Sequence, residues 1–192
     1  MTSRSLDRWR TIRRRELDEI EAAHARVGGP VRGRRYTTQQ INRAYTVLLS
    51  SQFQGFCRDL HSEVADHLAN AITHSALRDL LRVRLTEGRK LDSANPNPGN
   101  LGSDFGRFGL AFWDVVKKAD KRNDARRRRL EELNVWRNAI AHHDFDPARL
   151  GGATELRVAK VRGWRSARDA LVRSFDQGLG RCVKDVVGAP PW

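Results

Sequence analysis

One long helical pattern of apolar residues, between Ile41 and Ile72, constrains the fold more than any other feature of the sequence. Apolar side chains recur there at spacings of three and four residues over about eight turns, at Ile41, Tyr45, Leu48, Leu49, Phe53, Phe56, Leu60, Val64, Leu68 and Ile72. This spacing places them on one face of an α-helix. Thr37 or Thr38 can cap its start. We therefore expect a long helix that forms the spine of a helical core.

Several shorter segments on both sides of this spine also have helical spacing. The predicted helices span 6–27, stopped by the sequence Gly28-Gly29-Pro30, then 75–85, then 103–118, capped by Ser103, then 123 to about 143, and finally 164–187. The segment 95–100 is rich in Asn and Pro and is expected to be a surface loop. Between 154 and 162, apolar and charged residues alternate, which permits a short strand or hairpin.

These elements predict an all-α bundle of about five to six helices. With 192 residues, the chain has the length of one domain. We therefore expect a single domain over 1–192, with its core over about 37–187 and a charged N-terminal helix at 1–27.

The chain is strongly basic, with 36 Lys and Arg against 23 Asp and Glu and a formal net charge of +13. This charge favours a polyanionic partner such as RNA. The alternative is codon bias, because 30 of the basic residues are arginines and a GC-rich genome raises arginine content without selection for binding. The densest basic run, formed by Arg126, Arg127, Arg128 and Arg129, is either a solvated helix face or a set of phosphate contacts for RNA.

The sequence also argues against several classes of protein. No apolar run approaches the ~18 residues that span a bilayer, and the first 15 residues carry six arginines instead of the apolar stretch of a signal peptide. We therefore expect a cytoplasmic protein without membrane contact, in which Cys57 and Cys182 are reduced thiols. Neither a metal nor a cofactor is expected, because the candidate ligands are spread around one helix: Asp59, His61, Asp66, His67 and His74.

Three chemically useful side chains gather near the end of the helix that is predicted from residue 123. On a helical wheel, the apolar residues of this helix define a buried face: Leu130, Leu133, Trp136 and Ile140. Arg137 falls inside that stripe, where a guanidinium is costly unless an anion, a carbonyl or another protein surface satisfies it. Asn138 and His142 lie together on the other side of the helix, one turn apart.

This arrangement resembles a known family. The sequence Arg-Asn-x-x-x-His near a helix end, in a small, basic, all-α chain, is similar to the R-x4-6-H motif of the HEPN superfamily of prokaryotic ribonucleases and toxins. The longer stretch LNVWRNAIAHHDF (133–145) resembles the helix that carries this motif. The spine stretch AYTVLLSSQFQGFCRDLHSEV (44–64) is similar to the first core helix of RiboL-PSP-type HEPN domains, which often carry an acidic residue near the position of Gln54.

The resemblance implies an HEPN-like helical bundle that acts as a metal-independent endoribonuclease. The ribose 2′-OH of RNA is itself the nucleophile, so the protein must supply a base, an acid and a cation. His142 would transfer protons, Arg137 would bind the phosphate, and Asn138 would orient the phosphate or the histidine. The family also implies a two-fold homodimer that combines both motifs in one cleft. Its implied setting is a toxin–antitoxin or antiphage system, with a nucleotidyltransferase-like protein as a candidate antitoxin.

Several alternatives stay open. His142 could be a C-terminal helix residue that the helix dipole favours, and Arg137 could pair with an acidic group inside the bundle. His143 also fits the motif, as R-x5-H, although His142 is the histidine that shares a face with Asn138. Finally, the chain could be a non-catalytic HEPN module that binds RNA or a partner protein.

Overall fold

The computed structural model describes residues 1–27 and 35–192, and no β-strand occurs among them. The helices are α1 (Arg4–Arg8), α2 (Arg14–Val27), α3 (Arg35–Asn70), α4 (Ser75–Thr86), α5 (Lys90–Ser93), α6 (Pro98–Gly106), α7 (Phe112–Ala119), α8 (Asn123–His142) and α9 (Val158–Val187), with a π-helical segment, η1 (Trp9–Arg13), between α1 and α2. The all-α prediction is confirmed.

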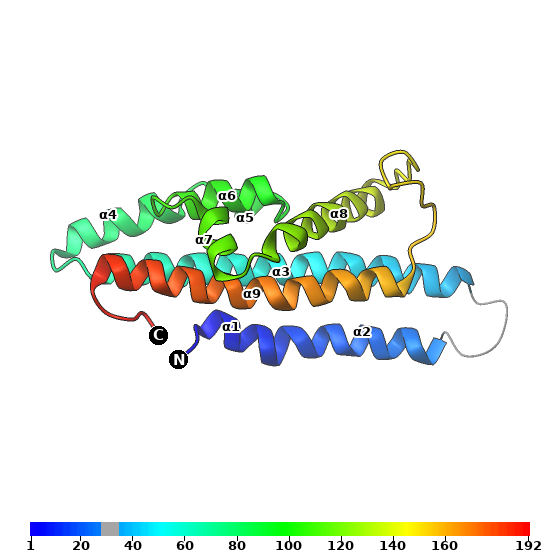
Figure 1. Cartoon of the computed structure of the whole chain (residues 1–192), viewed down its shortest axis with the longest axis horizontal. Coiled ribbons are helices and arrows are strands. Elements are labelled where there is room, and N and C mark those ends of the chain that lie inside the picture. The colour runs from blue at the N-terminus through cyan, green and yellow to red at the C-terminus, as the bar shows by residue number, and fades with distance from the viewer. Residues whose placement is uncertain (28–34) are drawn as a thin grey trace.

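Two long helices, α3 and α9, lie side by side through the middle of the molecule (Figure 1). α1 and α2 lie along one side of this pair, and α4 to α8 lie on the other. α8 packs against both α3 and α9. The helix that carries the Arg137–His142 segment is therefore supported by both central helices.

α3 is the predicted spine, and its apolar face is buried in the hydrophobic core. The following residues of that face are buried: Tyr45, Leu49, Phe53, Phe56, Leu60 and Val64. The helix begins at Arg35, ahead of the predicted caps Thr37 and Thr38. The predicted stop of the preceding helix, at Gly28-Gly29-Pro30, lies outside the described residues.

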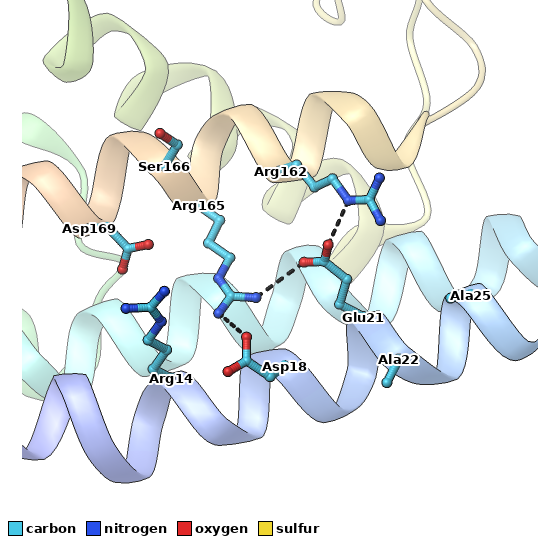
Figure 2. Close-up of a pocket in the computed structure, with 9 residues that line it drawn as sticks. All are labelled: Arg14, Asp18, Glu21, Ala22, Ala25, Arg162, Arg165, Ser166 and Asp169. Atoms are coloured by element: carbon cyan, nitrogen blue, oxygen red, sulfur yellow. Dashed lines mark hydrogen bonds and ion pairs between the residues drawn. The ribbon is translucent and has the colours of Figure 1, made fainter.

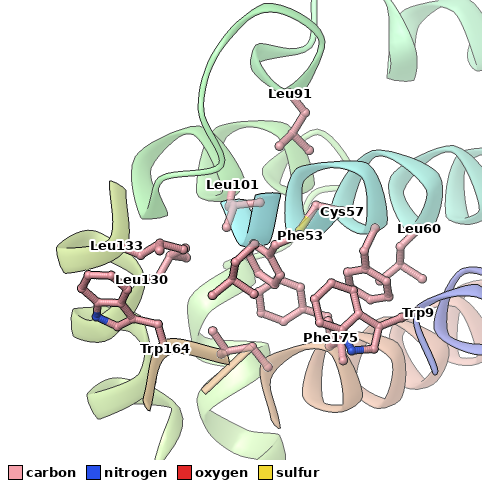
Figure 3. Close-up of a cluster of buried hydrophobic side chains, with 14 of the residues drawn as sticks. Trp9, Phe53, Cys57, Leu60, Leu91, Leu101, Leu130, Leu133, Trp164 and Phe175 are labelled. Atoms are coloured by element: carbon pink, nitrogen blue, oxygen red, sulfur yellow. The ribbon is translucent and has the colours of Figure 1, made fainter. Parts of the chain in front are cut away.

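Aromatic rings from several parts of the chain fill the centre of the core (Figure 3). Phe53 and Phe56 of α3 contact Trp9 at centroid distances of 6.3 and 5.9 Å. Phe53 also contacts Phe175 of α9 at 6.0 Å, and Phe175 meets Phe112 of α7 edge to face at 4.8 Å. These rings bury large apolar areas in favoured relative orientations. Trp9 and Phe53 are thus core residues.

The core also holds a buried cation. Arg168 of α9 has 0% exposure, and its guanidinium lies 5.4 Å from the centroid of the Phe53 ring. Its Nη2 donates to the carbonyl oxygen of Arg129 at 3.1 Å. Its Nε and Nη1 have no hydrogen-bond partner among the described residues. Burial lowers the pKa of Arg168 to about 9.

The N-terminal segment is helical, as predicted, but the π-helical segment Trp9–Arg13 interrupts it. Arg13 reaches across α3, where it donates to Gln52 and pairs with Asp59, both at 2.7 Å. Its guanidinium lies over Gly55, where a Cβ atom would approach Nη1 to 2.5 Å. A larger residue there would displace the end of the Arg13 side chain and disturb its contacts with Gln52 and Asp59. The buried apolar residues of that segment are Leu6, Trp9 and Leu17.

The region predicted as one helix over 103–118 consists of two helices, so that prediction is wrong. α6 begins earlier, at Pro98, because the Asn97 side chain accepts a backbone N–H at 2.8 Å and caps it. Proline at the first helical position gives up no hydrogen bond. The predicted cap, Ser103, lies inside α6. Gly109, with a φ of 75°, lies between α6 and α7 and permits the chain to turn there.

The strand or hairpin considered for 154–162 does not form. α9 begins at Val158, and an irregular segment precedes it. Leu156 is buried, and side-chain amides of α3 satisfy its backbone. Its N–H donates to Gln39 Oε1 at 3.0 Å, and its carbonyl accepts from Asn42 Nδ2 at 2.7 Å. The alternating pattern therefore reflects one buried loop residue followed by the start of a helix.

Three further observations bear on the predictions. Residues 1–27 and 35–192 contain more helical segments than the predicted five to six, because the helices expected at 6–27 and 103–118 are both interrupted and the short helix α5 is not among those expected. Cys57 and Cys182 are free thiols, as predicted. Within 1–27 and 35–192, no helix is long and apolar enough to cross a membrane.

Candidate active site at the end of α8

α8 ends in a backbone conformation that is uncommon for a histidine. His143 has a φ of 55° and a ψ of 34° and is the one non-glycine residue with positive φ among those described. Its amide donates to Ile140 at 3.4 Å, and the amide of Asp144 donates to Ala139 at 2.9 Å. This is the Schellman arrangement, in which glycine usually occupies the left-handed position. A side chain there costs about 1–2 kcal/mol, and residues strained in this way cluster at functional sites.

Arg137 lies half-buried near this end of α8, beside the buried residues Leu133 and Trp136. Its Nη1 donates to the side-chain oxygen of Asn138 at 3.4 Å. No carboxylate forms an ion pair with it in the described part of the chain, so the alternative in which Arg137 pairs with an acidic group inside the bundle is not supported. The guanidinium keeps most of its donors available for an anion.

The side-chain amide of Asn138 has a defined orientation. Its Oδ1 accepts from Asn95 Nδ2 at 2.6 Å and from Arg137 Nη1 at 3.4 Å. Because a guanidinium can only donate, the oxygen of Asn138 must face it. The Asn138 Nδ2 group is therefore left as a donor beside Arg137. Two neighbouring residues thus offer N–H groups, which suits an anionic oxygen.

Asn95 is a component of this site that sequence analysis missed. It belongs to the loop between α5 and α6, and hydrogen bonds from side-chain amides fix the backbone of this loop. Asn100 Nδ2 donates to the Asn95 carbonyl at 2.7 Å. Asn134 Nδ2 donates to the Pro96 carbonyl at 3.3 Å, and Gln54 Nε2 donates to the Ala94 carbonyl at 3.0 Å. An Asn- and Pro-rich stretch predicts a turn. No local pattern indicates a partner at a separation of 43 residues.

His142 is the last residue of α8 and is exposed. Among the described residues, no hydrogen bond joins it to Arg137 or Asn138. It follows Asn138 by four residues, a rise of about 6 Å along the axis. The structure thus brings Arg137 and Asn138 together and leaves His142 about one turn beyond them, open to solvent.

The four arginines at the start of α8 have different surroundings. Arg126 pairs with Asp120 at 2.8 Å and is partly buried at the corner between α7 and α8. The guanidinium of Arg127 lies 4.8 Å from the centroid of the Trp113 ring. Arg128 and Arg129 are exposed. The run therefore consists of one partly buried residue, Arg126, and three exposed residues, of which Arg127 contacts a tryptophan ring.

The histidines and aspartates of α3 do not gather into a metal site. His61 is fully buried and hydrogen-bonded within the core. Asp59 pairs with Arg13, and Asp66 pairs with Arg82 at 2.8 Å. No group of three or more His, Cys, Asp or Glu side chains in the described ranges could hold a metal ion.

A charged groove of about 570 Å³ lies between α2 and α9 (Figure 2). Arg165 pairs with both Asp18 and Glu21, and Glu21 also accepts from Arg162 at 2.6 Å and from Tyr45 at 2.8 Å. Burial raises the pKa of Glu21, but the hydrogen bonds from Tyr45 and Arg162 and the nearby arginine charges lower it overall. Because these charges neutralise one another, we interpret the residues of this groove as a set of ion pairs that stabilises the packing of α2 against α9.

The fold and the helix end together define a class of protein, a small helical bundle with an Arg-Asn-x-x-x-His motif, as in HEPN domains. The family model of RiboL-PSP-HEPN matches residues 11–177, and the chain therefore belongs to this family. The match includes the whole of α3 and α8, the two helices that carry the resemblance. Comparison with curated proteins gave no match, and neither did comparison with solved structures.

Proposed function

We propose that this protein is a metal-independent endoribonuclease whose active site consists of Arg137, Asn138 and His142. The observation that carries the proposal is the half-buried Arg137, without a carboxylate partner in the described residues, next to the amide donor of Asn138. Such a pair attracts an anion. A phosphodiester is the anion that suits a family whose members are often ribonucleases.

The reaction needs no nucleophile from the protein. His142 takes the proton of the ribose 2′-OH, the 2′ oxygen bonds to phosphorus, and the bond from phosphorus to the 5′ oxygen breaks. A second acid protonates the departing oxygen. Arg137 and Asn138 stabilise the charge on the phosphorane oxygens. The products are a 2′,3′-cyclic phosphate and a 5′-hydroxyl.

One imidazole cannot readily act as base and acid in the same step, so we propose a homodimer in which His142 of one protomer is the base and its symmetry mate is the acid. The exposure of His142 at the helix end is compatible with this arrangement. By family analogy, the biological setting is a cytoplasmic toxin of a toxin–antitoxin or antiphage system, with a nucleotidyltransferase-like antitoxin.

Substitution of His142 tests the proposal. His142→Ala is expected to lower the RNA cleavage rate by about 10²- to 10⁴-fold with little loss of stability, because the side chain is exposed. EDTA is expected to leave the wild type active. Cleavage of a labelled single-stranded RNA, with analysis of the product ends, measures both. His74→Ala, another exposed histidine, is the matched control.

Two results would contradict this assignment in different ways. Activity that survives in His142→Ala and disappears in His143→Ala would move the catalytic role to His143. Products with a 3′-hydroxyl, or strict dependence on magnesium, would exclude the chemistry itself.

A non-catalytic module that binds RNA or a partner protein is the second candidate. It is favoured by the separation of His142 from the Arg137–Asn138 pair in the described contacts. In that case the wild type would bind RNA without cleaving it, and Arg137→Ala would weaken binding while His142→Ala would not.

A further inference from the structure

A recess of about 710 Å³ lies between the N-terminal half of α3 and the end of α8. His143 forms part of its wall, and His143 directly follows the proposed catalytic histidine in the chain. Consecutive Cα atoms are 3.8 Å apart, so the recess adjoins the proposed active site. Its chemically distinctive residues are Tyr36, Gln40, Arg43, Ser51, His143 and Phe145.

Rings and a cation form the walls of this recess. The guanidinium of Arg43 lies 4.2 Å from the centroid of the Phe145 ring. The imidazole of His143 meets the same ring edge to face at 5.4 Å. His143 makes this contact from its left-handed backbone conformation. Tyr36, on the first turn of α3, is 78% exposed and makes no ring contact among the described residues.

An exposed aromatic ring and a cation that line the same recess have a specific chemical use. Unpaired bases stack on aromatic side chains, and arginine contacts the adjoining phosphates. Arg43 forms no ion pair with a carboxylate in the described part of the chain, so its charge remains available. Gln40 and Ser51 are exposed in the same recess and can both donate and accept hydrogen bonds at a base edge.

We propose that this recess binds one unpaired RNA base next to the scissile phosphate, with the base stacked on Tyr36 and a neighbouring phosphate on Arg43. This assignment rests on the proposed function, because the recess would hold the same RNA strand that the active site cleaves. A second copy of the chain is the competing occupant. Protein interfaces also favour aromatic residues and arginine, but a second copy of this chain carries the same net charge of +13, whereas RNA presents negative phosphates that complement Arg43.

A binding experiment with a base analogue tests the proposal. Single-stranded RNA oligonucleotides with one 2-aminopurine are titrated into the full chain carrying His142→Ala, which prevents turnover. We expect quenching of the fluorescence at one position of the strand. Adding Tyr36→Ala is expected to remove this quenching and to weaken affinity about 5- to 150-fold, the loss of one base stack, whereas Tyr36→Phe retains both.

Leu77→Ala is the matched control, because Leu77 is 54% exposed on α4, away from the recess (Figure 1). Arg43→Gln is expected to lower the salt dependence of binding without removing the quenching. Unchanged affinity and quenching in Tyr36→Ala would overturn the proposal. So would a change from dimer to monomer in Tyr36→Ala without loss of affinity per protomer, because the recess would then be an interface between copies.

The two proposals fail separately. If wild-type protein cleaves RNA and Tyr36→Ala cleaves and binds it equally well, the recess does not hold a base and the proposed function stands. If wild-type protein does not cleave RNA but shows quenching that depends on Tyr36, the recess assignment stands and the endoribonuclease does not.

Discussion

His61 shows how the core fixes the protonation state of a single side chain. It is 0% exposed. Its Nε2 donates to the carbonyl oxygen of Asp104 at 3.0 Å, and Arg89 Nη1 donates to its Nδ1 at 3.3 Å. A carbonyl oxygen only accepts and a guanidinium only donates, so the ring is neutral with its proton on Nε2. Burial, with the charges of Arg89 and Arg107, outweighs the Asp104 carbonyl and lowers the pKa of His61 to about 4.

This histidine makes stability depend on pH. In the unfolded chain a histidine has a pKa of about 6.5, so as the pH falls the unfolded state binds the proton first. The contribution of the neutral His61 ring to the free energy of unfolding is therefore fully present above about pH 6.5. It is lost as the pH falls toward 4, by roughly 3 kcal/mol. Urea denaturation at pH 7, 5.5 and 4.5 is expected to show this loss.

His61→Gln keeps a donor for the Asp104 carbonyl but cannot titrate. We expect this variant to be less stable at pH 7 and to lose less stability between pH 6.5 and 4. His74→Gln, at an exposed position, is the control and should follow the wild type. An equal slope in wild type and His61→Gln would show that other groups cause the acid sensitivity.

At the scale of residues, sequence analysis predicts whether a side chain is buried better than it predicts which residues that side chain contacts. The wheel of α8 correctly identifies Leu130, Leu133 and Trp136 as buried. It also places Arg137 beside them, where the structure leaves it half-buried. The contact with Asn95 is not predictable, because it depends on where a distant loop is anchored. Arg168 likewise occupies a core position that its charge argues against.

At the scale of elements, α8 illustrates why a run of like charges is not one surface. Successive helical residues are rotated by 100°, so four consecutive arginines point in different directions. Arg126 is held by Asp120, and hydrogen bonds from Arg122 and Arg126 hold the pKa of that carboxyl well below its usual range. Arg127, Arg128 and Arg129 are all exposed to solvent, but Arg127 also contacts the Trp113 ring.

This difference predicts distinct effects on RNA binding. Changing both Arg128 and Arg129 to Gln is expected to reduce the slope of log K against log salt for single-stranded RNA by about 1.4, or 0.7 per phosphate contact. Arg126→Gln should leave the slope unchanged and lower stability instead. Binding measured over a range of salt concentrations distinguishes them. If both variants reduce the salt slope equally per arginine, the ion pair of Arg126 with Asp120 does not prevent Arg126 from binding RNA.

Elements with a long periodic pattern are predicted well, and elements defined by distant contacts are not. α3 and α8 follow from their own spacing, because each has a continuous apolar face. The starts of α6 and α9 do not, although the predicted end of α9 at Val187 is confirmed. α6 depends on the Asn97 cap, and the segment before α9 is held by Gln39 and Asn42, which lie more than 100 residues earlier in the chain.

At the scale of the whole molecule, the proposed mechanism requires a second copy of the chain, because one imidazole cannot readily act as base and acid in the same step. A cleft that needs His142 from both protomers predicts a dimer by light scattering. It also predicts that mixing wild type with excess His142→Ala, followed by exchange of protomers, lowers activity as the square of the wild-type fraction. A linear decrease would mean that each chain works alone, and a monomer at working concentration would refute the shared cleft.

The pairing of α3 with α9 has a consequence for how the protein is made. α9 is translated after every other described element, yet it packs along the spine, and its Asp176 accepts the amide of Ser3 at 3.0 Å across 173 residues. Contacts of such long range slow folding. The 30 residues of α9 take roughly 2 to 6 seconds to synthesise at 5–20 residues per second. During that time the emerging chain carries its Arg137–His142 motif without one of the two central helices that support α8, so the proposed active site is completed only after α9 has been made.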